Sequence, residues 1–376
     1  MGFLYVLILI AIIARVLFVV YQRNAFKSFD YECYFDKSEV SEGDEVDLIE
    51  IVTNRKLMPV PWLKSEITTS KWLDFAGSQS LVAEETRFVP SFFMMKSFHK
   101  TVRRWHVKCL KRGVYTIDRV ILITTDLFGM ASSSNTYHVG ATLTVLPEGA
   151  DLSADFDAAQ KLTGDVIVRR HYIDDPFYRA GIKEYSPRDP INRIHWPATA
   201  KSGKLMVHNN QFSADQDLLV ILNVQSRDYE RDAVIDAEKI ENGIRICAGY
   251  FEDTLRSGIP VRFAANASFT GDRSAIISNS YHGAEHVGDL METLARIPLQ
   301  SCDTFSVFLS GACRELTASD IVIVTSYLND TIYDYARSKR EAGSQVKIIY
   351  TTLLTDEYVP DDCTVFGYLG KERTLQ

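Results

Sequence analysis

Several short motifs that carry well-known chemistry are missing from this chain of 376 residues. It has no GxxxxGK[S/T] loop and no GxGxxG turn, so neither an ATP site nor a dinucleotide site is indicated, and no small-molecule cofactor is expected. Its formal net charge of -8 provides no broad basic surface for nonspecific binding of nucleic acid. It has no low-complexity tract, and a hydrophobic fraction of 46% is ample for folded domains.

Cysteines are few and widely spaced, with no CxxC pair among the six. This pattern excludes the dense disulfide framework of a small secreted domain and fits a protein of a reducing compartment. We predict that the thiols serve as small buried apolar side chains and not in redox or metal chemistry. The residues concerned are Cys33, Cys109, Cys247, Cys302, Cys313 and Cys363.

One long hydrophobic run stands near the start of the chain, from Phe3 to Val20, with Arg15 inside it. About 18 helical residues would span roughly 27 Å, close to the hydrocarbon thickness of a bilayer. We therefore predict a transmembrane anchor over residues 1–24. Because Arg15 lies near its C-terminal end and Arg23 and Lys27 lie beyond it, the positive-inside rule places the remaining chain on the cytoplasmic side. The sequence thus predicts a single-pass protein of the cell membrane.

Short alternating runs separated by turn residues fill residues 27–150, with no helical period. Strands are predicted at Phe29–Phe35, Val46–Thr53, His99–Cys109 and Val114–Thr124. This pattern is typical of an immunoglobulin-like β-sandwich. Three tryptophans of this segment are assigned to buried or half-buried packing and not to ligand binding: Trp62, Trp72 and Trp105.

Residues 213–376 show a different rhythm, in which buried strands alternate with helices. Strands are predicted at Asp217–Val224, Pro260–Ala265, Asp320–Ser326 and Gln345–Tyr350. Helices are predicted at Asp232–Leu255, Glu285–Ile297, Phe305–Leu316 and Asp330–Ala342. The alternation predicts an α/β fold whose mainly parallel sheet is covered on both faces, with any ligand site at the C-terminal ends of its strands.

Residues 151–212 are predicted to be a linker, and they hold the most distinctive stretch, GIKEYSPRDPINRIHWPATAKSGKLMVHNN. It resembles the signature of a bacterial family, domain-of-unknown-function family 58, which is roughly R-x-Y-x-x-G-D-x-x-R-x-I-H-W-x-x-S-A-R. The upstream stretch KRGVYTIDRVILITTDLFGM also resembles that family, in its R-G-x-Y…D-P-F-G segment. The signature match is carried by Glu184, Tyr185, Pro187, Asp189, Arg193, Ile194, His195, Trp196, Ala200 and Lys201.

Three positions depart from the family pattern. Arg188 stands where the family has Gly, Pro197 where it has a basic residue, and Leu127 where it has Pro. These changes affect turn geometry more than the polar residues. They therefore weaken any transfer of loop conformation from the family to this chain.

The resemblance implies a C-terminal domain similar to von Willebrand factor A domains, which carry a metal-ion-dependent adhesion site, and association with MoxR-type AAA+ ATPases. The adhesion site needs D-x-S-x-S after the first buried strand, because its oxygens are the hard ligands of Mg²⁺. Here Asn223, Gln225 and Arg227 occupy those positions, which removes the carboxylate and adds a cation. We predict that the metal site is lost. A replacement through other side chains stays open, from Ser226, Asp228 or Asp330.

The signature segment could supply acid, base and cation for catalysis. We favour a polar network instead, in which Asp189 pairs with Arg193, His195 bonds to backbone and Trp196 fills a crevice between domains. The spacing of His282, Glu285 and His286 also matches the H-x-x-E-H motif of one zinc-peptidase class. No zinc site is assigned to it, because Gly283 stands where that motif needs a firm helix.

Together these features predict a non-enzymatic, membrane-tethered scaffold or adaptor. Its α/β domain and signature segment would dock protein partners, with a MoxR-type AAA+ ATPase as the implied partner, in the assembly or maturation of other proteins. Two alternatives stay open: a hydrolase or transferase that uses His195 and Asp189, and an extracellular metal-dependent adhesion protein. The predicted partner-binding residues are Tyr185, Asp189, Arg193, His195, Trp196 and Lys201.

Overall fold

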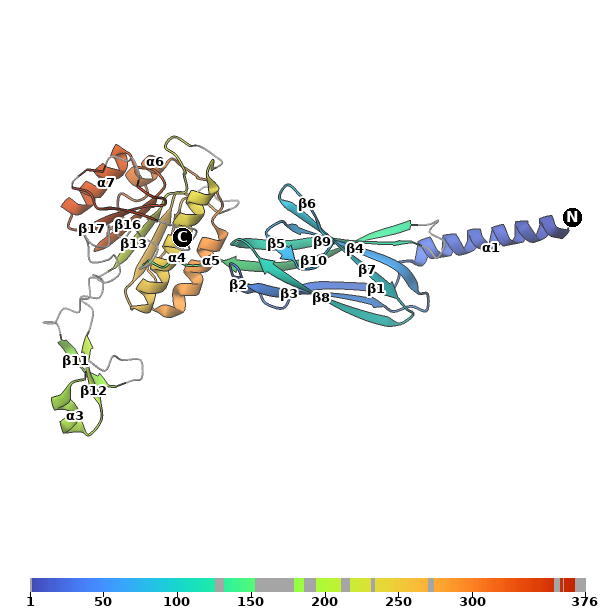
Figure 1. The fold of residues 1–376 in the computed structure, drawn as a ribbon, viewed down its shortest axis with the longest axis horizontal. Coiled ribbons are helices and arrows are strands. Elements are labelled where there is room, and N and C mark those ends of the chain that lie inside the picture. The colour runs from blue at the N-terminus through green and yellow to red at the C-terminus, as the bar shows by residue number, and fades with distance from the viewer. Residues whose placement is uncertain are drawn as a thin grey trace. The chain divides into compact units, whose positions relative to one another are not determined.

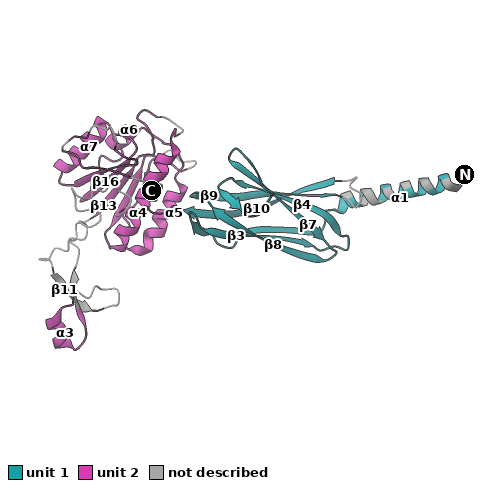
Figure 2. Cartoon of the chain, viewed as in Figure 1, with its two compact units in different colours: residues 1–147 teal, residues 148–376 magenta. Residues whose placement is uncertain are grey.

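The computed structural model describes residues 2–125, 132–152, 179–185, 194–210, 217–230, 234–269, 274–354, 359–360 and 362–368 (Figure 1). The chain divides into two compact units, Met1–Pro147 and Glu148–Gln376 (Figure 2). Each unit folds around its own hydrophobic core.

Helix α1, Gly2–Asn24, carries the N-terminal hydrophobic run. The predicted transmembrane anchor is wrong, since no helix in the described part of the chain has both the length and the apolarity to cross a membrane. The charge of Arg15 supplies a physical reason. The uninterrupted apolar stretch before it, Phe3–Ala14, is only about 18 Å long as a helix, against a hydrocarbon core of about 30 Å. The predicted fold class, which included this anchor, and the predicted single-pass location are corrected with it.

The rest of the first unit is a β-sandwich, as predicted. This unit therefore consists mostly of β-sheet. One sheet has the strand order β1-β3-β8-β5, formed by Phe29–Phe35, Glu45–Asn54, His99–Cys109 and Leu73–Phe75. The other has the order β2-β10-β9-β4-β7-β6, formed by Glu39–Ser41, Ser132–Leu146, Gly113–Thr125, Val60–Ser70, Thr86–Met95 and Leu81–Ala83.

The tryptophans of the sandwich do not all pack as predicted. Trp72 and Trp105 lie partly buried against the core, which confirms the packing interpretation for these two. Trp62 is 61% exposed, so the interpretation is wrong there. The reason is its place in β4, because the ladder with β7 is irregular between Val60 and Leu63, both of which point inward, and Trp62 falls on the outward side.

The second unit is built on a six-stranded sheet whose order is β15-β14-β13-β16-β17-β18. All neighbouring strands are parallel except the short β15, which is antiparallel to β14. Because β13 and β16 are buried on both faces, their sequences are almost continuously apolar. In sheet order the strands are Ile276–Ile277, Val261–Ala265, Leu218–Leu222, Asp320–Thr325, Gln345–Tyr350 and Val365–Gly367.

Helices cover both faces of this sheet. On one face lies α4, Ala237–Arg256, whose Phe251 ring meets that of Phe263 on β14 edge to face, with the ring centres 5.4 Å apart. Helix α5, Val287–Arg296, packs beside α4. On the other face α6, Phe305–Ser310, and α7, Asp330–Glu341, share a core with Ile221 and Ile323. Helix α6 is six residues shorter than predicted, because the chain leaves the helical conformation at Gly311.

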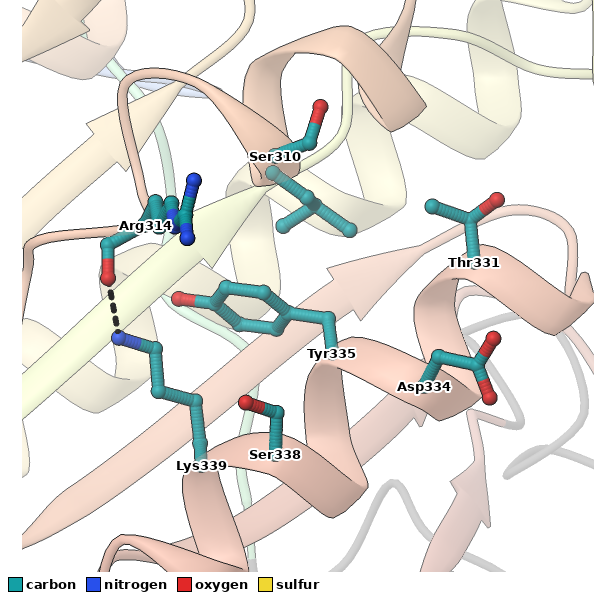
Figure 3. A pocket seen from close by; sticks show the side chains of 8 residues that line it. Ser310, Arg314, Thr331, Asp334, Tyr335, Ser338 and Lys339 are labelled. Carbon is teal, nitrogen blue, oxygen red and sulfur yellow. Dashed lines mark hydrogen bonds between the residues drawn. The ribbon is translucent and has the colours of Figure 1, made fainter.

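A buried lysine joins α7 to the turn that follows α6 (Figure 3). The Lys339 ammonium donates hydrogen bonds to the carbonyl oxygens of Arg314, at 2.8 Å, and Leu316, at 2.6 Å. It also lies 5.4 Å from the centre of the Tyr335 ring, whose hydroxyl donates to the carbonyl of Cys313 at 3.2 Å. The turn Gly311–Leu316 is therefore held against one face of α7.

All six cysteines are free thiols; Cys302 is half-buried and the other five are buried, which confirms the packing prediction for those five. Burial raises the pKa of Cys313 to about 12. A thiol whose pKa is higher in the folded than in the unfolded chain contributes stability that is complete below the unfolded value, about 8.5, and is lost as the pH approaches the folded value.

We therefore expect the free energy of unfolding to fall as the pH rises from 8.5 towards 11, with Cys313 alone responsible for about 3 kcal/mol. Urea unfolding of Cys313→Ala and of the wild type across this range measures the contribution, because their difference cancels the titrating groups that do not interact with Cys313. Cys302→Ala, at the half-buried thiol, is the control and should follow the wild type more closely. Parallel pH profiles for the wild type and Cys313→Ala would contradict the expectation.

Candidate functional site

Loops at the C-terminal ends of β13, β14, β16 and β17 meet along one edge of the parallel sheet, the edge at which this class of sheet binds ligands. Here the edge is filled by polar side chains that are no more than 1% exposed. We call them the edge network: Asn223, Gln225, Ser226, Asn266, Thr325, Ser326 and Thr351.

Asn223 directly follows β13, at the position where the adhesion-site pattern has its aspartate. Its Nδ2 donates to Thr325 Oγ1 at 3.0 Å, and its Oδ1 accepts from the backbone N–H of Gln225 at 3.0 Å. The Thr325 hydroxyl donates its own proton to the carbonyl of Tyr327 at 2.9 Å. A neutral amide therefore uses both of its polar atoms within the protein, where the pattern would place a metal-binding carboxylate.

Gln225, at the first serine position of the pattern, is the centre of the edge network. Its Oε1 accepts from the backbone N–H of Phe305 at 2.6 Å, from the Tyr327 hydroxyl at 3.2 Å and from Asn266 Nδ2 at 3.5 Å. Its Nε2 donates to the carbonyl of Glu230. One side chain thus connects the loops after β13, β14 and β16 with the start of α6.

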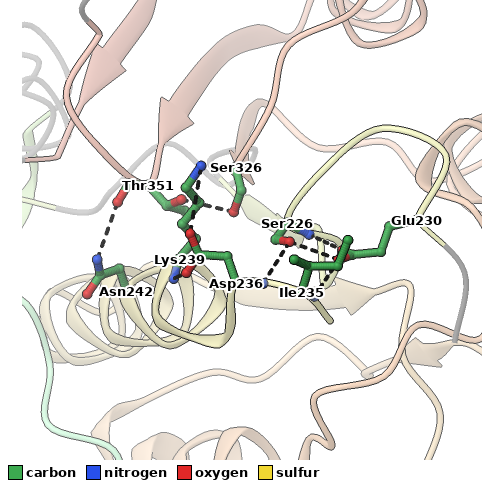
Figure 4. A network of polar contacts seen from close by, with 8 residues as sticks. All are labelled: Ser226, Glu230, Ile235, Asp236, Lys239, Asn242, Ser326 and Thr351. Carbon is green, nitrogen blue, oxygen red and sulfur yellow. Dashed lines mark hydrogen bonds and ion pairs between the residues drawn. The ribbon is translucent and has the colours of Figure 1, made fainter. Parts of the chain in front are cut away.

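Glu230 closes the loop between β13 and α4 (Figure 4). Its carboxylate accepts from the backbone N–H of Ser226 at 2.5 Å, from the Ser226 hydroxyl at 2.9 Å and from the backbone N–H of Ile235. Ser226 Oγ in turn accepts from the backbone N–H of Asp236, the N-cap of α4, at 3.1 Å. Ser326 and Thr351 join their hydroxyls at 2.9 Å in the same view.

Sequence reasoning did not single out Asn266 or Glu230. A signal for Asn266 exists, because it follows the buried strand β14 just as Asn223 follows β13. Its Oδ1 accepts from the backbone N–H of Val224 at 2.6 Å. Nothing local marks Glu230, whose role depends on a loop closure that the sequence does not reveal.

The open alternative of a replacement metal site involved Ser226, Asp228 and Asp330. Ser226 is engaged by Glu230, Asp228 accepts from Asn329 Nδ2 at 3.1 Å, and Asp330 begins α7. Within the described ranges, no group of three or more His, Cys, Asp or Glu side chains is arranged to hold a metal ion.

Three large side chains of the β13–α4 loop point outward from the edge network. Arg227 is exposed, Tyr229 is 86% exposed and Ile235 is 66% exposed. Tyr229 has a φ of 62°, in the left-handed region that residues other than Gly, Asn and Asp rarely adopt. We call these three residues the loop surface. It offers a cation, an aromatic ring and an aliphatic chain to solvent.

Part of the signature segment forms a small hairpin with a helix. Strands β11, Arg179–Glu184, and β12, Met206–Asn210, pair antiparallel, and α3, Trp196–Ser202, lies between them in the chain. His195 is the N-cap of α3, where its Nδ1 accepts from the backbone N–H of Ala198 at 3.0 Å. Its own backbone N–H donates to the carbonyl of Met206 at 2.7 Å.

The other predicted site residues fall partly on this hairpin. The backbone N–H of Tyr185 donates to the carbonyl of Leu205 at 2.8 Å, which closes the base of the turn. Trp196 is 66% exposed, and Lys201 is exposed in the last turn of α3. The predicted pair of Asp189 and Arg193 lies outside the described residues.

The segment with zinc-peptidase spacing forms a short 3₁₀ helix, Ala284–His286, that leads into α5. His286 Nδ1 lies 2.8 Å from a carboxylate oxygen of Asp289, one turn further along. One of the three motif side chains is therefore engaged with α5.

Comparison with known proteins gives a sequence relative and partial structural matches. No family model matches the chain. It is 20% identical over 333 residues to the uncharacterised protein YeaD of Bacillus subtilis (strain 168), a match that covers 86% of this chain and 76% of that protein.

The structural matches include a CARDB domain from Pyrococcus furiosus, 12% identical with a TM-score of 0.22, covering 32% of this chain and 94% of that one. A non-cellulosomal cohesin from Archaeoglobus fulgidus is 10% identical with a TM-score of 0.22, covering 31% and 91%. At these identities and TM-scores the matches carry no inference about function. The chain is similar to YeaD over most of its length.

Proposed function

We propose that this chain is a non-enzymatic scaffold that docks protein partners through the loop surface and the hairpin of the signature segment. The observation that carries the proposal is that the same edge of the sheet has a buried part, the edge network, and an exposed part, the loop surface. Inside, Asn223 and Gln225 are fully engaged with protein groups. This favours docking over catalysis, because a substrate or metal would have to displace those buried hydrogen bonds.

The residue types of the exposed surfaces support the same proposal. Tyr, Trp and Arg dominate the binding energy of protein interfaces, and the loop surface and hairpin expose Tyr229, Arg227 and Trp196. The left-handed backbone of Tyr229 costs free energy without any packing in return, as strained residues at functional sites do. His195 fits this function as a positioning residue, because it caps the helix that presents Trp196.

The family resemblance supplies the class of partner, a MoxR-type AAA+ ATPase. In this proposal the chain would hold the ATPase or its client during assembly or maturation of other proteins. A scaffold of this kind needs no bound cofactor of its own.

The proposal is tested by titrating the purified chain with a MoxR-type ATPase from the same genome and measuring the affinity by calorimetry. We expect the pair Arg227→Ala and Tyr229→Ala to weaken binding by at least about thirtyfold, since the truncation of even one hot-spot residue costs about 2 kcal/mol or more. Arg104→Ala with Tyr34→Ala, exposed on the sandwich, is the matched control. No binding by the wild type, or equal binding by both double variants, would overturn the proposal.

A further inference from the structure

A pocket lies between the end of α6 and one face of α7, in a part of the second unit that the docking proposal does not use (Figure 3). Its volume is about 300 Å³, at the lower limit of the range for small-molecule sites. Such a volume suits one or two amino-acid residues. A larger ligand could place only its end inside.

The floor of the pocket is rigid and partly apolar. Tyr335 and Leu309 form part of the lining. The ring is fixed at its hydroxyl by the carbonyl of Cys313, and the Lys339 ammonium beside it is fixed by two carbonyls. A floor held by these contacts is preformed, which lowers the entropic cost of binding an apolar side chain.

Opposite charges stand at the two ends of the pocket. At one end lies Arg314, which is exposed and takes no part in the ion pairs found among the described residues. At the other end lies Asp334, whose carboxylate is 3.2 Å from Arg337. Arg337 is held more closely by Asp362, at 2.6 Å, so Asp334 is the weaker of its two partners and can accept a further donor.

The spacing along α7 orders these groups. Asp334 and Lys339 are five residues apart, or about 7.5 Å along the helix axis, with Tyr335 and Ser338 between them on the pocket side. A ligand with an anionic end, an apolar side chain and a hydrogen-bond donor in that order would match the cationic end, the Tyr335 ring and Asp334 in turn.

We infer that this pocket binds the carboxylate-terminal residue of a peptide. The carboxylate forms a paired hydrogen bond with the Arg314 guanidinium and accepts from the Ser338 hydroxyl. The apolar side chain lies on Tyr335 against Leu309, and the donor at the other end binds Asp334. Two kinds of ligand have these groups. In a free dipeptide the N-terminal ammonium would bind Asp334, and at the C-terminus of a protein a backbone N–H would bind it.

The test uses three probes with the full chain: Ala-Phe, N-acetyl-Ala-Phe and N-acetyl-Ala-Phe-amide, titrated while the amide NMR signals of α7 are followed. We expect saturable binding of a carboxylate probe and none of the amide. Arg314→Gln should weaken that binding by at least about tenfold, because a charge-assisted pair is replaced by a neutral one. Arg104→Gln, exposed on the other unit, is the control and should bind as the wild type does.

The source is read from the first two probes and from Asp334→Asn. Binding of Ala-Phe alone, lost in Asp334→Asn, identifies a free dipeptide. Equal binding of both carboxylate probes identifies a protein C-terminus. The inference is overturned if no probe saturates at millimolar concentration, if the amide binds as well as the acids, or if Arg314→Gln binds unchanged. None of these outcomes depends on the ATPase, so the docking proposal stands or falls separately.

Discussion

Replacing Glu50 with alanine is expected to lower the free energy of unfolding of the sandwich by about 3–5 kcal/mol. Glu50 is completely buried, in the inward row of β3 between Leu48 and Val52. Its carboxylate accepts hydrogen bonds from four side chains: Tyr31 at 2.9 Å, Ser91 at 2.9 Å, Trp105 Nε1 at 3.3 Å, and Ser65.

The size of this effect follows from where the four donors come from. Tyr31 and Trp105 belong to the same sheet as Glu50, whereas Ser65 and Ser91 belong to the opposite sheet. The carboxylate therefore ties the two sheets together through the core. Alanine would remove the acceptor, leave buried donors unpaired and open a cavity. Burial, with Glu50 as the next contribution, raises the pKa of Tyr31, so its hydroxyl keeps the proton that it donates.

Urea unfolding followed by tryptophan fluorescence measures the loss. Glu50→Gln keeps the volume and one acceptor but turns an amide donor towards the hydroxyls, so we expect an intermediate loss. Glu45→Ala, exposed on the same strand, is the matched control and should stay within about 0.5 kcal/mol of the wild type. If Glu50→Ala unfolded at the same urea concentration as the control, the carboxylate would not be a structural tie.

Local periodicity made much of this architecture predictable. The alternation that places Val46, Leu48 and Val52 inward is visible in the sequence, and it also places Glu50 inward. What the sequence could not show is that β4 and β7 of the other sheet bring serines to that carboxylate, because the packing of one sheet on the other joins residues that are 15 and 41 positions apart. The same limit applies to Gln225, whose partners Phe305 and Tyr327 are 80 and 102 positions away.

Two predictions failed because the effect of a local interruption in a hydrophobic pattern was underestimated. The run from Phe3 to Val20 has the composition of a membrane helix but is divided by Arg15. Trp62 sits among strand residues, yet an irregular ladder beside it shifts the side chain to the outward face. A charge within an apolar run and a local break in strand register each change the environment of a residue more than its type does.

Asn223→Asp is expected to destabilise the second unit by about 3–5 kcal/mol, and Mg²⁺ is not expected to restore the loss. The change puts back the carboxylate that the adhesion-site pattern requires, at a position only 1% exposed. Its new oxygen would face Thr325 Oγ1, whose proton is already given to Tyr327. Two acceptors would then oppose each other, with the buried charge uncompensated because Arg227 points to solvent.

The pH dependence of the stability lost in Asn223→Asp tests this prediction a second time. Burial without a cation favours the protonated acid, so the folded variant would bind a proton more tightly than the unfolded chain does. The penalty is therefore fully present well above the raised pKa and shrinks as the pH falls towards 4. Thermal unfolding of the variant and the wild type at several pH values, with and without millimolar Mg²⁺, measures both effects. Asn279→Asp, in an exposed loop, is the control.

The response to Mg²⁺ separates the two remaining interpretations of this edge. If the edge network has replaced the metal site, Mg²⁺ changes the stability of Asn223→Asp no more than that of the control, since Gln225 and Arg227 offer the ion no pair of hydroxyl ligands. If Mg²⁺ instead raised the unfolding temperature of Asn223→Asp selectively, the loop geometry of a metal-dependent adhesion site would have survived the loss of its carboxylate. This edge of the sheet would then be a metal site that lacks only its carboxylate, and not a docking surface over a fully hydrogen-bonded edge network.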